Sequence, residues 1–569
     1  MQEHLIAECL DCGKQSSYTP EISTCPHCGS GWREARYDYQ AIGPRLIEAI
    51  QGRSFDIWRF RELLPIQEHH PIISMGEGGT PLLKAPHLGM MLNLPNLYIK
   101  DERQNPTGSF KDRQAAITVA SLKEAGVTET VLASTGNVAI SYSAYASRAG
   151  IKLWAFLTSL VPTEKMREVA VYGTQVIKVT ATYDDTKKFA AEFAKKRPSG
   201  SYLERGVRSI PALEAMKTIA FEISEQLTKA MGPPQRASGE EAPPWRVPDW
   251  YIQSISGGLG PVGVLKGFEE LKTMGLIDRI PAVAGIQTAG CAPMVHAWQQ
   301  DRKTAEPITS PRTHIATLAT GDPGRTYTIL RDRMLRGGGG TFELASDEEA
   351  FRSIHVLAKM EGMSMEPASA VAFAGLIKMA RSGQIKPDDV VVVNLTGHTM
   401  PVEKMILGEG WIQDVELPQE PKGRKPEEGL LSALNRITPD QYSSVAIVDD
   451  HDHARRLIRR ILQSQGDFTI YEATDGHEAV ELARREQPDV MILDLMMPEM
   501  DGFAVLDALK ADESTASIDV IVVTAKALTP DEQNQLRGRI HSLMQKGEFL
   551  DDELVEEINT LLKSDEGNS

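Results

Sequence analysis

The chain has 569 residues, 41% hydrophobic and 24% charged, which is too long for one hydrophobic core, and it lacks the run of 18 apolar residues that a membrane span needs. Its net charge of −17 is concentrated near the C-terminal end, where residues 444–569 hold 12 Lys and Arg against 27 Asp and Glu. This charge argues against binding of that end to the phosphate backbone of nucleic acids, and because the start shows no secretory signal we expect a cytoplasmic protein of several modules.

Residues 1–35 contain four of the five cysteines, arranged as two Cys-x2-Cys pairs: Cys9, Cys12, Cys25 and Cys28. Each pair can present two thiolates from a tight turn, and two pairs complete a tetrahedral site for structural Zn²⁺. The alternative is a set of redox-active or unrelated cysteines. We predict a small zinc ribbon, which has no open coordination position for catalysis.

Residues 36–412 alternate apolar, strand-like runs with amphipathic helical stretches, which predicts an α/β layer fold. The expected strands include residues 130–134, 176–180, 251–256, 283–287 and 390–397. The Pro- and Gly-rich stretch 231–248 is interpreted as a surface insertion between a helix and the next strand.

Two segments of this region carry candidate chemistry. The run NPTGSFK (105–111) predicts a turn followed by a helix that starts at Lys111, where a lysine that forms a Schiff base must be fixed. The run SISGGLG (254–260) predicts a strand, a Gly-rich turn and a helix N-terminus, which together form an anion site. Taken alone, Lys111 would be read as a solvated helix residue and the turn as a plain loop.

These runs, with ASTGNVAISYSAYASRAGI (133–151), EPASAVAFAGLIKM (366–379) and VVVVNLTGH (390–398), resemble threonine synthase, a pyridoxal phosphate (PLP) enzyme of fold type II. The resemblance implies a two-lobed α/β module like the tryptophan synthase β subunit and a homodimer, and the lack of a long apolar run adds the expectation of no membrane partner. It implies that Lys111 is catalytic and forms the Schiff base with PLP. The other implied cofactor contacts are Asn137 at the phenolic oxygen, Thr396 at the pyridine nitrogen, and the phosphate loop Ser256, Gly257, Gly258, Leu259 and Gly260. Ser134 and Thr135 are the implied substrate contacts.

The implied reaction converts O-phosphohomoserine to threonine and phosphate, or is a related elimination or replacement on another amino acid. The chain departs from the family at the substrate phosphate, where Gly206, Val207 and Ala212 stand in place of an Asn-Ser pair and an Arg. Arg205 and Arg208 lie nearby and are either substitutes or solvated loop residues. The alternative function is a signalling protein whose PLP module senses an amino-acid-like ligand without turnover.

The stretch LPQEPKGRKPEEG (417–429) has no apolar period, and residues 413–442 are predicted to be a linker. Residues 443–565 then show a five-fold β-α alternation, in which Asp449 and Asp450 follow the strand at its start and a second apolar strand, beginning at residue 489, ends in Asp494. Because parallel strands end at one edge of a sheet, these carboxylates should converge on a pocket for Mg²⁺. An Asp after a strand is, by itself, more often a helix cap.

The order of these residues, with the MPEMDG turn after Asp494 (497–502), resembles the receiver domain of response regulators. The resemblance implies a flavodoxin-like (βα)5 fold in which Asp494 accepts a phosphoryl group and Asp449, Asp450 and Asp494 bind magnesium. It implies that Thr524 and Lys546 sense the phosphoryl group. The implied partner is a sensor histidine kinase or phosphotransfer protein, and phosphorylation is expected to regulate the PLP module.

Overall fold

The computed structural model describes residues 5–19, 22–67, 72–134, 136–158, 161, 163–179, 183–196, 201–234, 242–398, 444–465, 468–524, 528–529, 532, 535–536 and 538–545. The chain divides into two compact units, residues 1–409 and 410–569. The predicted linker, Thr135 and Lys546 lie outside the described residues. The domain boundaries therefore stay predictions at 412 and 442.

The N-terminal segment forms a three-stranded antiparallel sheet in the order β2-β1-β3. Gly13 and Gly29 each follow the second cysteine of a pair and have φ of 68° and 74°, a conformation that favours glycine. The two cysteine pairs thus sit in tight turns beside this sheet. Its strands are β1 (Ile6–Cys9), β2 (Gln15–Ser17) and β3 (Arg33–Arg36).

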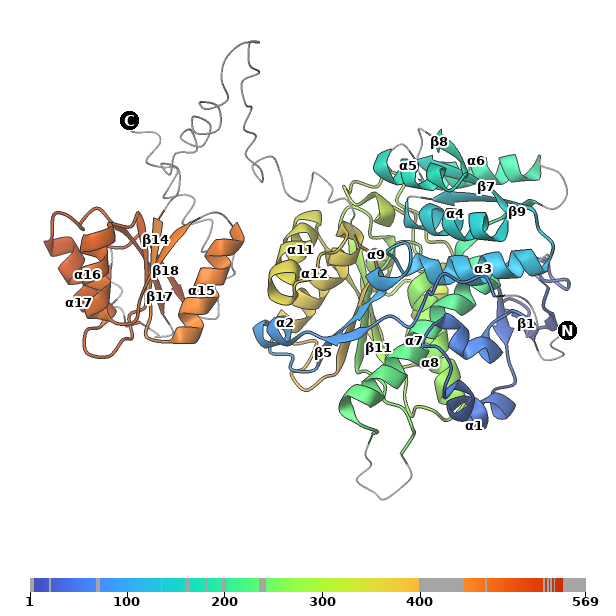
Figure 1. The fold of residues 1–569 in the computed structure, drawn as a ribbon, viewed down its shortest axis with the longest axis horizontal. Coiled ribbons are helices and arrows are strands. Elements are labelled where there is room, and N and C mark those ends of the chain that lie inside the picture. The colour runs from blue at the N-terminus through green and yellow to red at the C-terminus, as the bar shows by residue number, and fades with distance from the viewer. Residues whose placement is uncertain are drawn as a thin grey trace, which may run out of the picture. The chain divides into compact units, whose positions relative to one another are not determined.

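The larger lobe of the first unit contains a six-stranded sheet in the order β12-β11-β10-β13-β5-β4, in which only β4 runs antiparallel to its neighbour. The strands are β4 (Leu82–Lys84), β5 (Leu97–Asp101), β10 (Trp250–Ser254), β11 (Ala282–Thr288), β12 (Gly340–Ala345) and β13 (Val391–Leu395). Helices cover both faces of this sheet (Figure 1). They are α7 (Ile210–Met231) and α8 (Leu259–Thr273) on one face and α11 (Asp347–Glu361) and α12 (Pro367–Arg381) on the other.

Residues along one strand alternate between the two faces because the side-chain period of a strand is two. Tyr251 and Val392 pack into the core beneath α7 and α8, whereas Ile252, Val391 and Val393 pack against α12. Both faces are buried, which explains why these strands are apolar throughout and not alternating in hydrophobicity.

The smaller lobe is a four-stranded parallel sheet in the order β8-β7-β6-β9. Its strands are β6 (Glu129–Ser134), β7 (Lys152–Thr158), β8 (Gln175–Val179) and β9 (Ser201–Leu203). Leu132 and Leu157 face the helices α3 (Lys111–Glu124) and α4 (Asn137–Ala149), while Val131 and Phe156 face α6 (Tyr183–Lys195). The remaining helices of the unit are α1 (Tyr39–Ile50), α2 (Pro86–Met91), α5 (Thr163–Val171), α9 (Pro293–Gln299) and α10 (Thr326–Arg336), with short 3-10 turns at Ile57–Leu63, Glu102–Gln104, Gly206–Arg208 and Ala316–Leu318.

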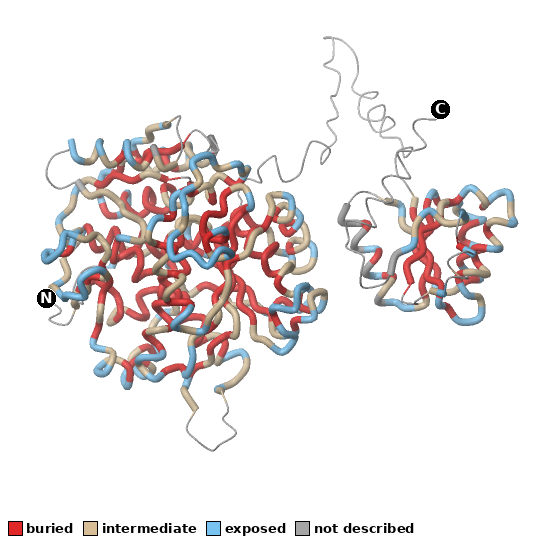
Figure 2. Tube along the Cα trace, turned by 180° about the vertical axis from the view of Figure 1, so that it is seen from behind, coloured by how far each residue is buried: buried red, intermediate tan, exposed pale blue. Residues whose placement is uncertain are grey.

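The second unit has a five-stranded parallel sheet in the order β15-β14-β16-β17-β18. The first strand therefore lies between the second and third, which is the order of a flavodoxin-like fold. Its strands are β14 (Ser444–Val448), β15 (Thr469–Ala473), β16 (Val490–Leu493), β17 (Asp519–Thr524) and β18 (Ser542–Gln545), and its described helices are α15 (Asp452–Gln465), α16 (Gly476–Glu486) and α17 (Gly502–Ala511). The strands form the buried centre of this unit (Figure 2).

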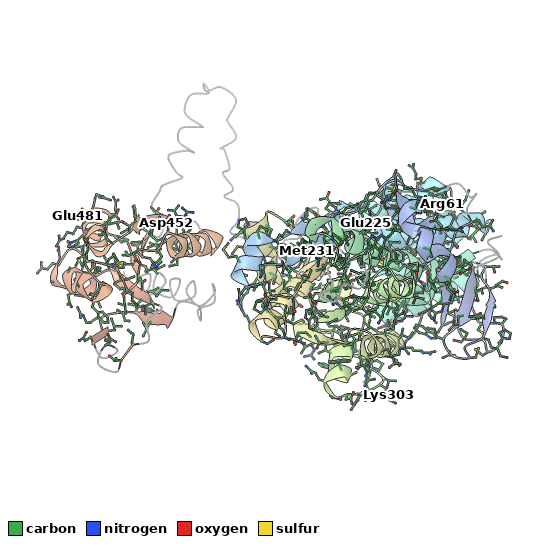
Figure 3. All side chains as sticks on the ribbon, turned by 90° about the horizontal axis from the view of Figure 1, so that it is seen from below. Arg61, Glu225, Met231, Lys303, Asp452 and Glu481 are labelled. Atoms are coloured by element: carbon green, nitrogen blue, oxygen red, sulfur yellow. The ribbon has the colours of Figure 1, made fainter. Side chains whose placement is uncertain are left out.

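The predicted fold class is confirmed in both units. In the described part of the chain no helix is both long and apolar enough to cross a membrane. Exposed charged side chains such as Lys303, Asp452 and Glu481 lie at the periphery of their units (Figure 3).

Candidate active site and phosphoacceptor site

A cavity of about 500 Å³ in the first unit collects residues from segments far apart in the sequence. It is lined by Lys111 at the start of α3, by Asn137 at the start of α4, by the loop 256–260 before α8, and by Thr396 just after β13. All the predicted cofactor contacts therefore meet in one place. A cavity of this size can hold a cofactor together with a small substrate.

Lys111 presents its amine to this cavity without a hydrogen bond or an ion pair to any described residue. Its Nζ lies 4.2 Å from the centre of the Phe110 ring. Burial lowers the pKa of Lys111 to about 8, against the opposing effect of Glu204 and Glu366. An amine with this pKa is partly neutral near physiological pH and is suited to imine formation with an aldehyde.

The loop 256–260 leads into the N-terminus of α8, where no side chain caps the helix. Gly258 occupies the last position before the helix with φ of 87°, and a Cβ built there would lie 2.7 Å from Cγ2 of Thr326. Ser256 is held by a 2.6 Å hydrogen bond between its Oγ and Oγ1 of Thr320. Free backbone N–H groups at a helix N-terminus bind anions, so this loop suits the phosphate of PLP.

Thr396 is brought next to Lys111 by the backbone. The N–H of Phe110 donates to the carbonyl oxygen of Thr396 at 2.9 Å. The Thr396 hydroxyl lies 2.7 Å from Oγ of Ser369, which also accepts from the N–H of Gly397. A fixed neutral hydroxyl at this position fits a ring nitrogen that stays unprotonated.

The side chain of Asn137 takes part in a polar cluster that the sequence did not predict. Its Nδ2 donates to both carboxylate oxygens of Glu366, at 2.9 and 2.8 Å, and its Oδ1 accepts from Lys165 at 3.3 Å. Lys165 also lies 3.6 Å from Glu366. Asn137 must exchange one of these contacts if it is to bond a cofactor oxygen.

Ser134 does not line the cavity in this structure. Its Oγ accepts hydrogen bonds from the N–H groups of Gly136 and Ala139, at 3.0 and 3.1 Å, and so stabilises the start of α4. Its role as a substrate contact stays a prediction. Trp32 of the N-terminal segment, by contrast, does line the cavity and had no signal in its local sequence.

The four N-terminal cysteines form a compact group. Their Sγ atoms all lie within 4.8 Å of one another, with Cys9 and Cys28 at 3.6 Å and Cys12 and Cys25 at 3.8 Å. Four thiolates at about 2.3 Å from a tetrahedral zinc ion are separated by about 3.8 Å. The geometry therefore fits zinc. The turn between Cys9 and Cys12 is tied to the rest of the first unit by an ion pair of Asp11 with Arg325.

In the second unit the predicted acidic residues follow neighbouring strands. Asp449 and Asp450 come directly after β14, Asp494 comes directly after β16, and Thr524 is the last residue of β17. The N–H of Asp494 donates to the carbonyl of Val448 at 2.9 Å, which links the two loops.

His451 is an addition to this site that sequence reasoning missed. Its Nδ1 lies 2.6 Å from Oδ1 of Asp450, and it forms with Asp449 and Asp450 a group whose ligand atoms are within 4.8 Å of one another. Asp494 lies outside that group of three. Two adjacent carboxylates at the edge of the sheet can hold Mg²⁺, and Asp494, which follows the neighbouring strand, stays a predicted third ligand.

Comparison with known families assigns both units. Residues 73–397 match the pyridoxal-phosphate dependent enzyme family, and residues 445–559 match the response regulator receiver domain. The chain belongs to the pyridoxal-phosphate-dependent enzyme family and carries a C-terminal receiver domain.

Within this enzyme family, the relatives of the chain include threonine synthases. The chain is 35% identical to the threonine synthase of Methanocaldococcus jannaschii over 396 residues, which cover 69% of this chain and 92% of that protein. It is 32% identical to the threonine synthase of Methanosarcina acetivorans, over 69% of this chain and 91% of that protein. A solved structure of the processed form of threonine deaminase isoform 2 from Solanum lycopersicum is similar with a TM-score of 0.46 and 19% identity, covering 57% of this chain and 85% of that one.

Proposed function

We propose that the first unit is a PLP-dependent lyase of the threonine synthase type, which converts O-phosphohomoserine to threonine and phosphate. The observation that carries this proposal is Lys111, whose unpaired amine faces a cavity that also contains an anion-binding helix N-terminus. The threonine synthases among the relatives support the choice of substrate.

Each part of the cavity has a distinct task in this reaction. PLP, when bound, supplies an electron sink for the charge that develops on the substrate. The loop 256–260 and the N-terminus of α8 bind the cofactor phosphate, and the neutral Thr396 hydroxyl keeps the ring nitrogen unprotonated, which favours elimination and replacement over transamination. The Nζ of Lys111 takes the proton from the substrate Cα and returns a proton later in the cycle.

The leaving phosphate of the substrate needs cations, and the cavity contains them. Arg205, Arg208 and Lys187 all line it. This favours Arg205 and Arg208 as substitutes for the Asn-Ser pair and Arg that are missing at Gly206, Val207 and Ala212. A guanidinium binds a phosphoryl group through two parallel hydrogen bonds.

Turnover of the PLP-loaded full chain tests the proposed reaction. We expect stoichiometric release of phosphate and threonine from O-phosphohomoserine, and loss of both products in Lys111→Ala. A change of the cofactor spectrum on substrate addition without phosphate release would contradict a lyase and support a non-catalytic ligand sensor.

We further propose that phosphorylation of Asp494 regulates this activity. The carboxylate of Asp494 would attack the phosphorus atom of a phosphohistidine donor while the P–N bond to the histidine breaks, and Asp449 and Asp450 would hold a Mg²⁺ ion that neutralises the developing charge. The test compares the rate of phosphate release with and without an acyl-phosphate donor, in the native chain and in Asp494→Asn. Equal rates in all four conditions would exclude regulation.

The cysteine group is proposed to hold a structural zinc ion. Zinc there would fix the turn that carries Asp11, which forms an ion pair with Arg325 at the start of α10. The next residue, Thr326, packs against Gly258 of the cofactor loop. The ribbon thus stabilises the cofactor loop through these contacts, and the zinc ion itself takes no part in the chemistry.

A further inference from the structure

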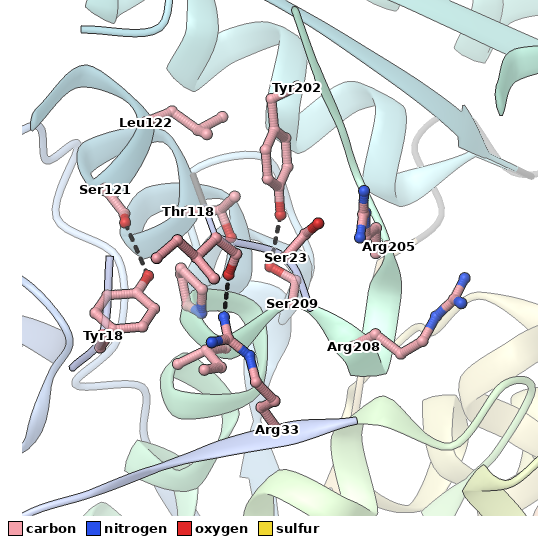
Figure 4. Close-up of a pocket in the computed structure, with 13 residues that line it drawn as sticks. Tyr18, Ser23, Arg33, Thr118, Ser121, Leu122, Tyr202, Arg205, Arg208 and Ser209 are labelled. Carbon is pink, nitrogen blue, oxygen red and sulfur yellow. Dashed lines mark hydrogen bonds between the residues drawn. The ribbon is translucent and has the colours of Figure 1, made fainter. Parts of the chain in front are cut away.

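A second, much smaller pocket lies where the N-terminal ribbon meets the rest of the first unit, and we refer to it as the seam pocket (Figure 4). Tyr18, Ser23 and Arg33 of the ribbon form one side. The other side comes from α3, β9 and the segment that leads into α7, and contributes Ser121, Tyr202, Arg205, Arg208 and Ser209. The family resemblance concerns only Arg205 and Arg208 of this lining, at the substrate phosphate, and gives Tyr18 and Arg33 no role.

The seam pocket has a strongly positive lining. Three of its thirteen lining residues are arginines, and none of the thirteen, all of which the structure describes, carries a carboxylate. Arg33 is the buried member, whereas Arg208 is exposed and interacts electrostatically with the Glu204 carboxylate. A buried cation without a counter-charge in its own pocket is costly unless an anion joins it, so the lining around Arg33 favours an anionic occupant.

Arg33 gives the sharpest evidence. Only 5% of this residue is exposed, and its guanidinium points into the group of hydroxyl-bearing side chains (Figure 4). Its Nη2 donates to the carbonyl oxygen of Ile22, but its Nη1 is buried without a hydrogen-bond partner among the described residues. A buried donor of this kind costs free energy until an acceptor satisfies it.

The helix α7 adds a second donor group. This helix is 22 residues long and starts just after Ser209, which makes no capping hydrogen bond through its side chain. Ser209 instead accepts from the hydroxyl of Tyr202 at 3.1 Å. The positive end of a long helix is thus left for an external anion.

Tyr18 is the tyrosine of the pocket that is suited to donate a hydrogen bond to an occupant, because the Tyr202 proton is already donated to Ser209. Burial raises the pKa of Tyr18 well above its usual range and that of Tyr202 to about 12, so both hydroxyls stay protonated. The Tyr18 hydroxyl lies 3.2 Å from Oγ of Ser121 and can turn its proton toward an occupant of the pocket.

We propose that the seam pocket binds a small tetrahedral oxyanion of the phosphate type, with Arg33 as its buried anchor. The pocket is distinct from the cofactor cavity, but the two share Arg205 and Arg208 as wall residues. An anion in the seam pocket therefore sets the position of two cations that also face the cofactor. The inference concerns binding and does not require the proposed reaction to be correct.

Phosphate binding to the full chain tests this site. PLP is first fixed by borohydride reduction so that the cofactor loop is filled, and inorganic phosphate is then titrated by calorimetry. We expect Arg33→Met to weaken phosphate binding by about tenfold or more, because it removes a charged donor. The matched control is Arg36→Met, which removes the same charge from the same strand. Arg36 pairs with Glu8 and lines neither cavity. The affinity of the Arg36→Met variant for phosphate should therefore stay within about twofold of the native value.

A second arm distinguishes the source of the ligand. O-phosphoserine competing with phosphate for the Arg33-dependent site would show that a phosphorylated amino acid is also accepted, and failure to compete would restrict the site to the free ion. If Arg33→Met does not fold, the phosphate affinity of Tyr18→Phe tests the site instead, because Tyr18 lines the seam pocket and not the cofactor cavity. Native affinity in every folded seam variant would overturn the proposal. The proposal would also be overturned if Arg205→Met lost phosphate binding while Arg33→Met or Tyr18→Phe kept it. That result would place the phosphate in the cofactor cavity.

Discussion

Replacement of Gly258 by alanine should destabilise the cofactor loop even before any cofactor binds. The residue has φ of 87°, and a left-handed backbone costs an L-residue with a Cβ about 1–2 kcal/mol. The new Cβ would also lie 2.7 Å from Cγ2 of the buried Thr326, and such overpacking costs about 1–3 kcal/mol. Together these effects predict a loss of about 2–5 kcal/mol in the free energy of unfolding of the first unit.

The neighbouring Gly257 is the matched control. It has no positive φ, and a Cβ there would meet nothing within 4 Å, so Gly257→Ala should change the free energy of unfolding by less than about 0.5 kcal/mol. Urea unfolding of the apo-protein, followed by tryptophan fluorescence, measures the difference. Six of the seven tryptophans belong to the first unit and the seventh, Trp411, precedes the predicted receiver, so the signal reports on the first unit and not on the receiver. Equal midpoints for the two variants would refute the conformation assigned to this loop.

Three further outcomes are expected. The rate at which the apo-protein captures PLP should rise with pH through the Lys111 pKa of about 8, because only the neutral amine forms an imine. Glu204→Gln removes a carboxylate that raises this pKa, so the midpoint of a stopped-flow pH titration should move to lower pH. An unchanged midpoint would exclude an influence of Glu204 on the Lys111 amine. Phosphorylation of the receiver by an acyl-phosphate donor, measured on phosphate-affinity gels, should be lost in Asp494→Asn and on removal of Mg²⁺ but retained in the control Asp507→Asn. Phosphorylation that persists in Asp494→Asn would show that another residue is the acceptor. Elemental analysis should find about one zinc per chain, lost in Cys12→Ser and kept in Cys291→Ser; equal zinc contents would rule out the cysteine site.

Features encoded by local sequence were predicted well. The strands alternate with helices as their apolar runs indicate, and α3 begins at Lys111, as the turn before it requires. In the second unit the parallel sheet brings Asp449, Asp494 and Thr524 to one edge because their strands are neighbours and end there. These predictions rest on periodicity and on the geometry of parallel sheets.

Contacts between distant segments could not be predicted in the same way. Lys165 and Glu366 join Asn137 only because α5 and the start of α12 approach α4 in the folded unit, and nothing in their local sequence indicates this. The Ser134 hydroxyl serves the start of α4, where free N–H groups compete for it with any substrate. Tertiary packing, which periodicity does not encode, decides both outcomes.

The identity of the cofactor-binding lysine is the most direct test of the account. The PLP-loaded full chain is reduced with borohydride, digested, and mapped by mass spectrometry. We predict a single pyridoxyl adduct on Lys111, and its loss together with the visible absorbance of the bound cofactor in Lys111→Ala. An adduct on another lysine, or a native protein that binds no PLP, would contradict the central claim.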